Sequence, residues 1–157
     1  AMTEVMHDYV HAQIQSGADC IQIFDSWGGM LDSQYEEFSL MYINELAKNI
    51  PSNIPVILYT RGKKIDSIIE STDINCFNLD ISDNIDHHIG KSIAIQGNFD
   101  PSKFHSDTDK LEELATNIFE KYKNKNNYIF NLGSGITPDI DPEKVGIFLE
   151  KLSGLGS

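Results

Sequence analysis

The stretch IQIFDSWGG at residues 21–29 is a short apolar run that ends in a carboxylate, a hydroxyl and two glycines. Four more apolar runs end in Gly, Asp or a hydroxyl residue, and a loop and a helical pattern follow each run. These four runs occupy residues 56–60, 76–80, 93–101 and 128–135. In parallel α/β folds the chemistry collects at the carboxyl ends of the strands. The pattern therefore predicts an α/β fold in which five parallel strands alternate with helices.

Helical patterns separate the expected strands. Residues 3–16 carry Val5, Tyr9 and Ala12 at helical spacing, which predicts a helix ahead of the first strand. Residues 107–123 form the clearest amphipathic stripe in the chain. Strands that alternate with helices through short connections indicate a mostly parallel sheet.

Two further helices begin at recognisable capping residues. Ser33 and Glu36 form a capping-box pair, and Asp141 followed by Pro142 is typical of a helix start. The first of these helices is expected to present one apolar face, made of Tyr35, Phe38, Tyr42 and Leu46. The second is expected to pack Val145, Phe148, Leu149 and Leu152. A shorter helix is expected at residues 64–70.

Five strands of this kind fit either an open doubly wound sheet or a piece of a closed barrel. All five strand ends carry polar or glycine-rich loops, whereas a doubly wound sheet concentrates function at one switch point. The pattern also begins with a helix rather than a strand. Both features favour a partial (β/α)8 TIM-type barrel.

Composition excludes several classes of partner. A chain of 157 residues is enough for one domain with a proper core. The net charge is −12 and Arg61 is the only arginine, which argues against binding to nucleic acid or to an anionic membrane surface. No apolar run approaches membrane-spanning length, and the amino terminus has no basic-then-apolar signal-peptide pattern. Cys20 and Cys76 are expected to be buried free thiols rather than a disulfide.

Gly133-Ser134-Gly135, after the fifth expected strand, is the strongest local signal of a binding site. Glycines let a backbone approach a ligand closely, and a serine between them can present its hydroxyl and its amide together. The segment is not a nucleophile elbow, and no phosphate-loop lysine follows it. A plain glycine turn between strand and loop remains the alternative interpretation.

Metal binding is not favoured by the remaining polar residues. Asp25, Asp80 and Asp100 end three different strands, but aspartates in such positions more often bind loop amides than a metal. His7 and His11 have the spacing of a helical zinc site, yet no glutamate directly follows the first histidine and no third ligand is evident. A solvated helix face is the preferred interpretation, and no metal site is predicted.

Several segments taken together resemble one known family. They are IFDSWGG (23–29), GNFDP (97–101), NLGSGI (131–136), Pro138 and DPE (141–143). In residues, order and spacing these segments resemble the uroporphyrinogen decarboxylase family. The resemblance implies that residues 1–157 form the carboxyl-terminal part of the family's (β/α)8 barrel, without the amino-terminal part.

The resemblance also implies a function. The family removes acetate carboxyl groups from uroporphyrinogen to give coproporphyrinogen in tetrapyrrole and heme biosynthesis, as a cytoplasmic homodimer that uses no metal or organic cofactor. The substrate-touching hydroxyl of the family corresponds to Ser26, Phe24 lines the cleft, and a family histidine corresponds to Ser134. The key catalytic aspartate, arginines and tyrosine of the family lie outside this segment, so no catalytic residue is predicted here and the segment is expected to be inactive alone.

Departures from the family pattern leave alternatives open. Serine at position 134 cannot carry a positive charge, and the usual lysine-bearing strand end is Thr60-Arg61-Gly62 here. One alternative is therefore a non-catalytic binding or scaffold protein of the same family. A less favoured one is a zinc and corrinoid methyltransferase from a related barrel family. A partial barrel also exposes strand edges, so self-association is expected.

Overall fold

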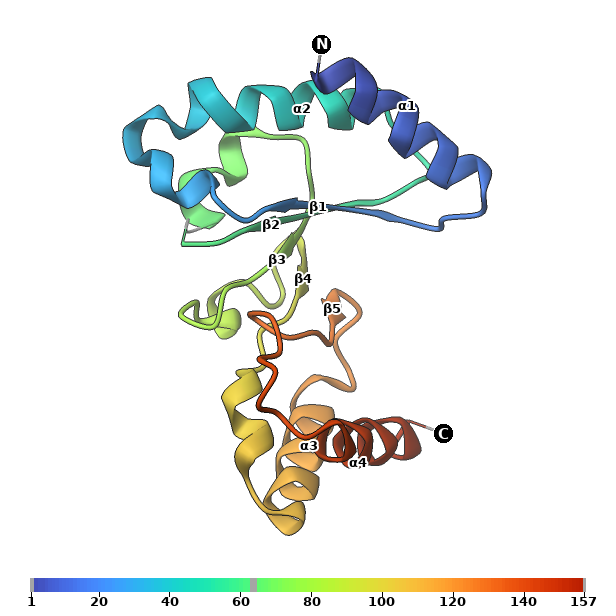
Figure 1. The fold of residues 1–157 in the computed structure, drawn as a ribbon, viewed down its shortest axis with the longest axis vertical. Helices are drawn as coiled ribbons and strands as arrows, with labels where there is room; N and C mark the ends of the chain where they lie inside the picture. The colour runs from blue at the N-terminus through green and yellow to red at the C-terminus, as the bar shows by residue number, and fades with distance from the viewer. Residues whose placement is uncertain (1, 63–64, 157) are drawn as a thin grey trace.

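The computed structural model describes residues 2–62 and 65–156. Its sheet has five parallel strands in the order β1-β2-β3-β4-β5, which confirms the expected α/β class. The strands are β1 (Ile21–Asp25), β2 (Val56–Thr60), β3 (Cys76–Asn78), β4 (Ala94–Gln96) and β5 (Tyr128–Ile129). Figure 1 shows the strands stacked in this order, so that each follows its neighbour in sequence.

Four α-helices cover the two ends of this stack. They are α1 (Met2–Gln15), α2 (Met41–Lys48), α3 (Thr108–Tyr122) and α4 (Pro142–Gly154). Helices α1 and α2 lie by β1 and β2, whereas α3 and α4 pack on each other at the other end (Figure 1). None of the helices in the described residues has the length and apolar character needed to cross a membrane.

Short helical turns make the remaining connections. They are η1 (Gly28–Gln34), η2 (Glu36–Leu40), η3 (Ile65–Ser67), η4 (Ile69–Ser71), η5 (Ile85–His87) and η6 (Pro101–His105). The π-helical turn η2 runs directly into α2. Two of these turns, η3 and η4, stand where one helix was expected at residues 64–70, and residue 64 lies outside the described part of the chain.

Strand register separates the side chains into two faces. Leu58 aligns with Phe77, and Phe77 aligns with Ile95, and all three are completely buried. They belong to an apolar core that α2 and the short turns complete. Because side chains alternate along a strand, their neighbours Ile57 and Cys76 point to the opposite, inner face.

A second core lies between α3, α4 and the loop after β4. Its centre is Phe148, whose ring lies 4.7 Å from Phe99, 5.6 Å from Phe104 and 5.5 Å from Phe130, measured between centroids. Asp141 caps α4 by accepting a hydrogen bond from the Glu143 amide, which confirms the expected helix start.

Several expected helix faces are wrong at the amino-terminal end. Ser33 lies within η1, and the N-cap residue of η2 makes no side-chain hydrogen bond to the helix. The expected capping box of Ser33 and Glu36 therefore does not form.

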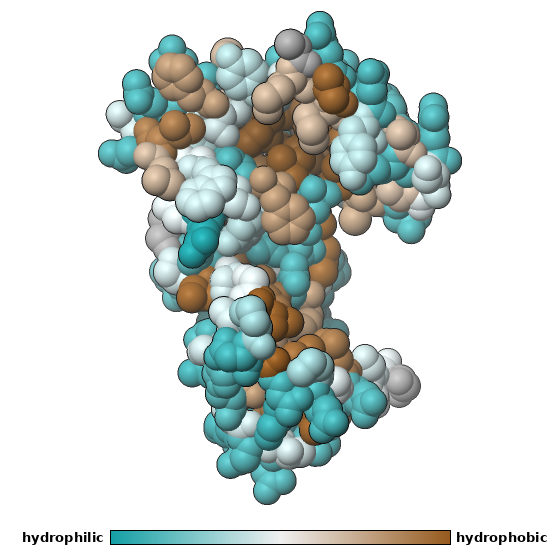
Figure 2. Space-filling model, in the orientation of Figure 1, coloured by the Kyte–Doolittle hydropathy of each residue, from teal (hydrophilic) through white to brown (hydrophobic). Residues whose placement is uncertain are grey.

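Tyr35 and Leu46 are buried as expected, but Phe38 and Tyr42 are 54% and 47% exposed. In α1 the buried residue is Val10 rather than Tyr9. Phe38 and Tyr42 line a groove with Met6 of α1 and Ile23 of β1, the edge strand of the described sheet. Figure 2 shows apolar side chains gathered in a hollow between α1 and α2.

Two smaller expectations also fail for physical reasons. Leu149 is exposed because α4 packs mainly through Phe148. Cys76 is a buried free thiol as expected, whereas Cys20 is free but exposed because it precedes the first residue of the edge strand β1.

Replacing Phe148 by alanine tests the second core. The removal of a completely buried ring with three aromatic neighbours is expected to lower the free energy of unfolding by about 3–5 kcal/mol. The neighbouring exposed Leu149→Ala substitution is the matched control, expected to cost below about 1 kcal/mol. Chemical denaturation followed by circular dichroism measures both, and equal costs would contradict the assignment of Phe148 as the centre of this core.

Candidate functional site

Polar residues that follow the five strands lie at one end of the sheet. Because the strands are parallel, the loops that follow them emerge at the same end, which we call the rim. Ser26 follows β1, Arg61 follows β2 and Asp80 closely follows β3. Asp100 and Ser134 follow β4 and β5. The rim thus contains Ser26 and Ser134 at its two ends.

The loop after β1 is held by the carboxylate of Asp25. Ser39 donates a hydrogen bond of 2.7 Å from its hydroxyl to this carboxylate. Burial and the nearby Asp25 carboxylate raise the pKa of the Tyr35 phenol. A Cβ atom at Gly28 would overlap the same carboxylate, so a larger residue there would have to displace the Asp25 side chain. Asp25 therefore shapes the loop that presents Ser26.

The loops after β3 and β4 are tied together by Asn98. Its side-chain amide donates to the backbone carbonyls of Asp80 and Asp83, each at 2.8 Å. Asp80 accepts a hydrogen bond from the Ser82 amide, and Asp100 accepts one from the Ser102 amide. Two of the three strand-end aspartates thus bind loop amides.

The loop after β5 approaches the loop after β3 closely. A Cβ atom at Gly133 would lie 2.7 Å from the Ile81 amide nitrogen, a distance that side chains essentially never show. The Gly133 amide also donates to the Phe99 carbonyl at 2.9 Å. Ser134 follows directly and is partly buried, so these contacts fix the backbone that carries its hydroxyl.

The inner face below the rim carries a buried amide network that sequence reasoning missed. The Gln96 side-chain amide donates to Asn78 at 2.7 Å and to Gln22 at 2.9 Å. Asn131 donates to the same Asn78 oxygen at 2.9 Å. The network links β1, β3 and β4 to the segment after β5. The spacing of these residues within separate strands gave no sign that they would meet.

Phe24 and Tyr59 form the aromatic part of the inner face near the rim. Their ring centroids lie 5.9 Å apart, and Phe24 is 67% exposed. Burial and the Asp80 carboxylate raise the pKa of Tyr59, and Arg61 opposes this shift. Tyr59 was not expected in the site. Its position near the carboxyl end of β2, on the inner face of the sheet, is a signal that could have identified it.

Cys20, Cys76 and His7 lie away from the rim. Within residues 2–62 and 65–156, no group of three or more His, Cys, Asp or Glu side chains is arranged to hold a metal ion. The Nε2 atom of His7 lies 3.4 Å from the side-chain nitrogen of Asn49, within the layer of helices. Cys20 and Cys76 stand at the amino ends of their strands, opposite the rim, and burial raises the pKa of Cys76 to about 11.

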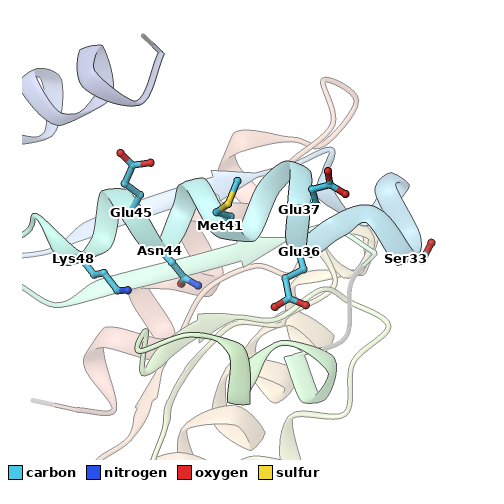
Figure 3. Close-up of a pocket in the computed structure, with 7 residues that line it drawn as sticks. All are labelled: Ser33, Glu36, Glu37, Met41, Asn44, Glu45 and Lys48. Atoms are coloured by element: carbon cyan, nitrogen blue, oxygen red, sulfur yellow. The ribbon is translucent and has the colours of Figure 1, made fainter.

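A separate depression of about 700 Å³ lies along η2 and α2. Figure 3 shows Glu36, Glu37 and Glu45 around it, with Lys48 at one end. These residues come from the helical layer rather than from the strand ends. Its three carboxylates make it a poor place for an anionic ligand, and it is not part of the rim.

The close approach of Gly133 to Ile81 can be tested by adding one methyl group. We expect Gly133→Ala to lower the free energy of unfolding by about 1–3 kcal/mol, because the new Cβ must displace backbone atoms. Gly135→Ala is the matched control, since a Cβ there meets open space, and its cost should stay within about 0.5 kcal/mol. Thermal and chemical denaturation measure both, and a neutral Gly133→Ala would refute the tight packing of this loop.

Comparison with solved structures places the fold. A methyltransferase from Methanosarcina mazei superposes with a TM-score of 0.73 over 99% of this chain and 48% of its own, at 18% sequence identity. At this level of identity the likeness shows the shared fold alone. It agrees with part of a (β/α)8-type barrel.

Comparison with sequences identifies the family. The uroporphyrinogen decarboxylase of Hydrogenovibrio crunogenus is 39% identical over 94% of this chain, and that of Pseudoalteromonas translucida is 38% identical over 90%. The chain spans 44% and 43% of the lengths of these relatives. The sequence model of the uroporphyrinogen decarboxylase family matches residues 1–154. The chain therefore belongs to the uroporphyrinogen decarboxylase family.

Proposed function

We propose that residues 1–157 form the carboxyl-terminal wall of a tetrapyrrole cleft that decarboxylates uroporphyrinogen to coproporphyrinogen. The observation that carries this proposal is the rim, where hydroxyl and aromatic side chains stand at the carboxyl ends of parallel strands in a chain of this family. The remaining wall of the cleft comes from the part of the family barrel that this sequence does not contain.

The described residues suit one side of a large, anionic substrate that carries pyrrole rings. The exposed ring of Phe24, backed by Tyr59, offers an apolar surface to the pyrrole rings. The hydroxyls of Ser26 and Ser134 can donate hydrogen bonds to substrate carboxylates. Arg61, whose positive charge lowers the pKa of Tyr59, can pair with a substrate carboxylate at the edge of the cleft.

The decarboxylation needs a proton donor and several cations, which residues 1–157 do not supply by themselves. A proton is added to a pyrrole carbon, the bond to the carboxylate carbon breaks as its electrons move into the ring, and carbon dioxide leaves. The methylene carbon is then protonated and the ring carbon loses its proton, so the ring is restored. A substrate with eight carboxylates needs several cations, whereas this chain has a net charge of −12 and a single arginine. The proton donor and most cations therefore belong to the other wall.

The location, oligomeric state, cofactor use and partners of the complete enzyme follow from the same proposal. The complete enzyme is a cytoplasmic homodimer that works without a metal or an organic cofactor, and its product feeds heme synthesis. Residues 1–157 are its carboxyl-terminal part and are inactive alone. Uroporphyrinogen is its small-molecule partner, and neither nucleic acid nor membrane is involved.

A non-catalytic member of the same family is the second candidate. Ser134 supports it, because a serine hydroxyl can donate a hydrogen bond but cannot carry the positive charge that a histidine would bring near a substrate carboxylate. A methyltransferase with a zinc–thiolate site receives no support from the positions of Cys20 and Cys76, which lie at the end of the sheet away from the rim.

Reconstitution tests the proposed reaction. The chain is co-expressed with the part of the Hydrogenovibrio crunogenus enzyme that precedes the matched region, and coproporphyrinogen is measured after oxidation by liquid chromatography. We expect product only when both polypeptides are present. Loss of one hydrogen bond to a charged carboxylate in Ser26→Ala or Ser134→Ala is expected to lower kcat/KM about tenfold or more. Ser52→Ala, at the opposite end of the sheet, should leave kcat/KM unchanged.

Two results decide between the candidates. An assembled and folded complex that neither makes product nor binds porphyrinogen would refute the decarboxylase proposal. In that case Ser134→His should also give no gain. A rise in kcat/KM with Ser134→His would instead show that the site is catalytic and limited by the missing charge.

A further inference from the structure

Asn78 is the centre of the amide network on the inner face of the sheet. It is 4% exposed, and its side-chain oxygen accepts hydrogen bonds from Gln96 at 2.7 Å and from Asn131 at 2.9 Å. These two bonds use both lone pairs of that oxygen. Asn78 therefore joins β3 to β4 and to the segment that leads into the loop of Ser134.

The side-chain nitrogen of Asn78 adds a second tie to the same segment. It donates to the backbone carbonyl of Leu79 at 3.3 Å, and it makes a longer bond of 3.5 Å to the carbonyl of Leu132. Only Gly133 stands between Leu132 and Ser134. A planar amide offers an acceptor and a donor together, which neither a leucine nor an ionised aspartate of similar size can do.

Regular strand pairing ends before this segment begins. Strand β5 contains two residues, Tyr128–Ile129. After it, the Phe99 amide donates to the Asn131 carbonyl at 3.1 Å, and the Gly133 amide donates to the Phe99 carbonyl at 2.9 Å. These backbone bonds tie the segment to the loop after β4, and the amide network ties it to the sheet.

Gln96 continues the network to the other side of the inner face. Its side-chain amide donates to Gln22 of β1 at 2.9 Å. Gln22 and Phe24 lie on the same face of β1 because side chains alternate along a strand. The chain of amides thus crosses from the strand that leads to Ser26 to the segment that leads to Ser134. Hydrogen bonds shielded from water strengthen one another in such a chain.

We propose that Asn78 is a positioning residue that holds the backbone of the Ser134 loop where the serine hydroxyl can meet a substrate carboxylate. It acts through Asn131 and Leu132 and does not touch the substrate itself. The part that this position plays in the reaction rests on the proposed function. The positioning of the loop rests on the contacts of Asn78 alone.

The competing interpretation is that Asn78 only stabilises the sheet. Buried amide bonds contribute to stability wherever they lie, so a loss of stability does not separate the two interpretations. Asn127 provides the matched comparison. Its side-chain amide donates to the Ile93 carbonyl at 2.9 Å, and it precedes β5 at the end of the sheet away from the rim.

Amide hydrogen exchange of the chain alone, followed by NMR, measures the positioning without the reaction. We expect Asn78→Leu to speed exchange at the Gly133 amide about tenfold or more, because the segment that carries it loses two ties. Asn127→Leu should change exchange at Gly133 by less than about twofold. Asn131→Ala breaks the same contact at a partly buried residue, and it covers the case in which Asn78→Leu does not fold. It should speed exchange at Gly133 about fivefold or more.

A double-mutant cycle in the reconstituted complex measures the consequence for the reaction. If Asn78 acts through Ser134, Asn78→Leu should lower kcat/KM about tenfold, as Ser134→Ala does. In the Ser134→Ala background the same Asn78 substitution should lower kcat/KM by less than about twofold. Asn127→Leu should change kcat/KM by less than about twofold in both backgrounds.

Two results would overturn the proposal. One is exchange at Gly133 that responds equally to the Asn78 and Asn127 substitutions, or to neither Asn78→Leu nor Asn131→Ala. The other is a cycle in which the losses from Asn78→Leu and Ser134→Ala multiply, since independent sites behave in this way. A folded complex that makes no product would refute the proposed reaction, and the exchange comparison on the chain alone would still decide whether Asn78 positions the loop.

Discussion

The parallel register of the sheet is the constraint on which the other features depend. It aligns Leu58, Phe77 and Ile95 on one face, where they are completely buried under the helical layer. The same register brings Gln96 and Asn78 together on the other face, where they bond through their amides. The first face is thus stabilised by the burial of apolar side chains, and the second presents polar side chains on the inner side of the sheet.

The rim is shaped by loop contacts that follow from this register. Asn98 ties the loops after β3 and β4 together, and Gly133 lets the loop after β5 approach Ile81. Asp25 holds the loop after β1 through Ser39. Most of the polar residues that define the family resemblance therefore have a structural role in holding these loops. The proposed cleft depends on the hydroxyls of Ser26 and Ser134, which these loops carry.

The sequence predicted the strands and the carboxyl-terminal helices well, because the apolar runs are short, α3 carries a clear amphipathic stripe and α4 begins at an explicit cap, Asp141. It did not predict the amide network, because Gln22, Gln96 and Asn131 are far apart in the chain and only the register brings them together. It also placed Phe38 and Tyr42 inward. Helical periodicity identifies an apolar face, but it does not say whether the chain itself supplies the surface that covers that face.

The central claim is that Ser26 and Ser134 face one tetrapyrrole cleft. The most direct measurement is an NMR titration of the complex with the amino-terminal half, using coproporphyrin as the ligand and isotope labelling of this chain alone. We predict that the amide signals of Ser26 and Ser134 shift together with a single dissociation constant, while those of Glu36 and Glu45 do not move. Shifts at the α2 depression, or at only one of the two serines, would contradict the claim.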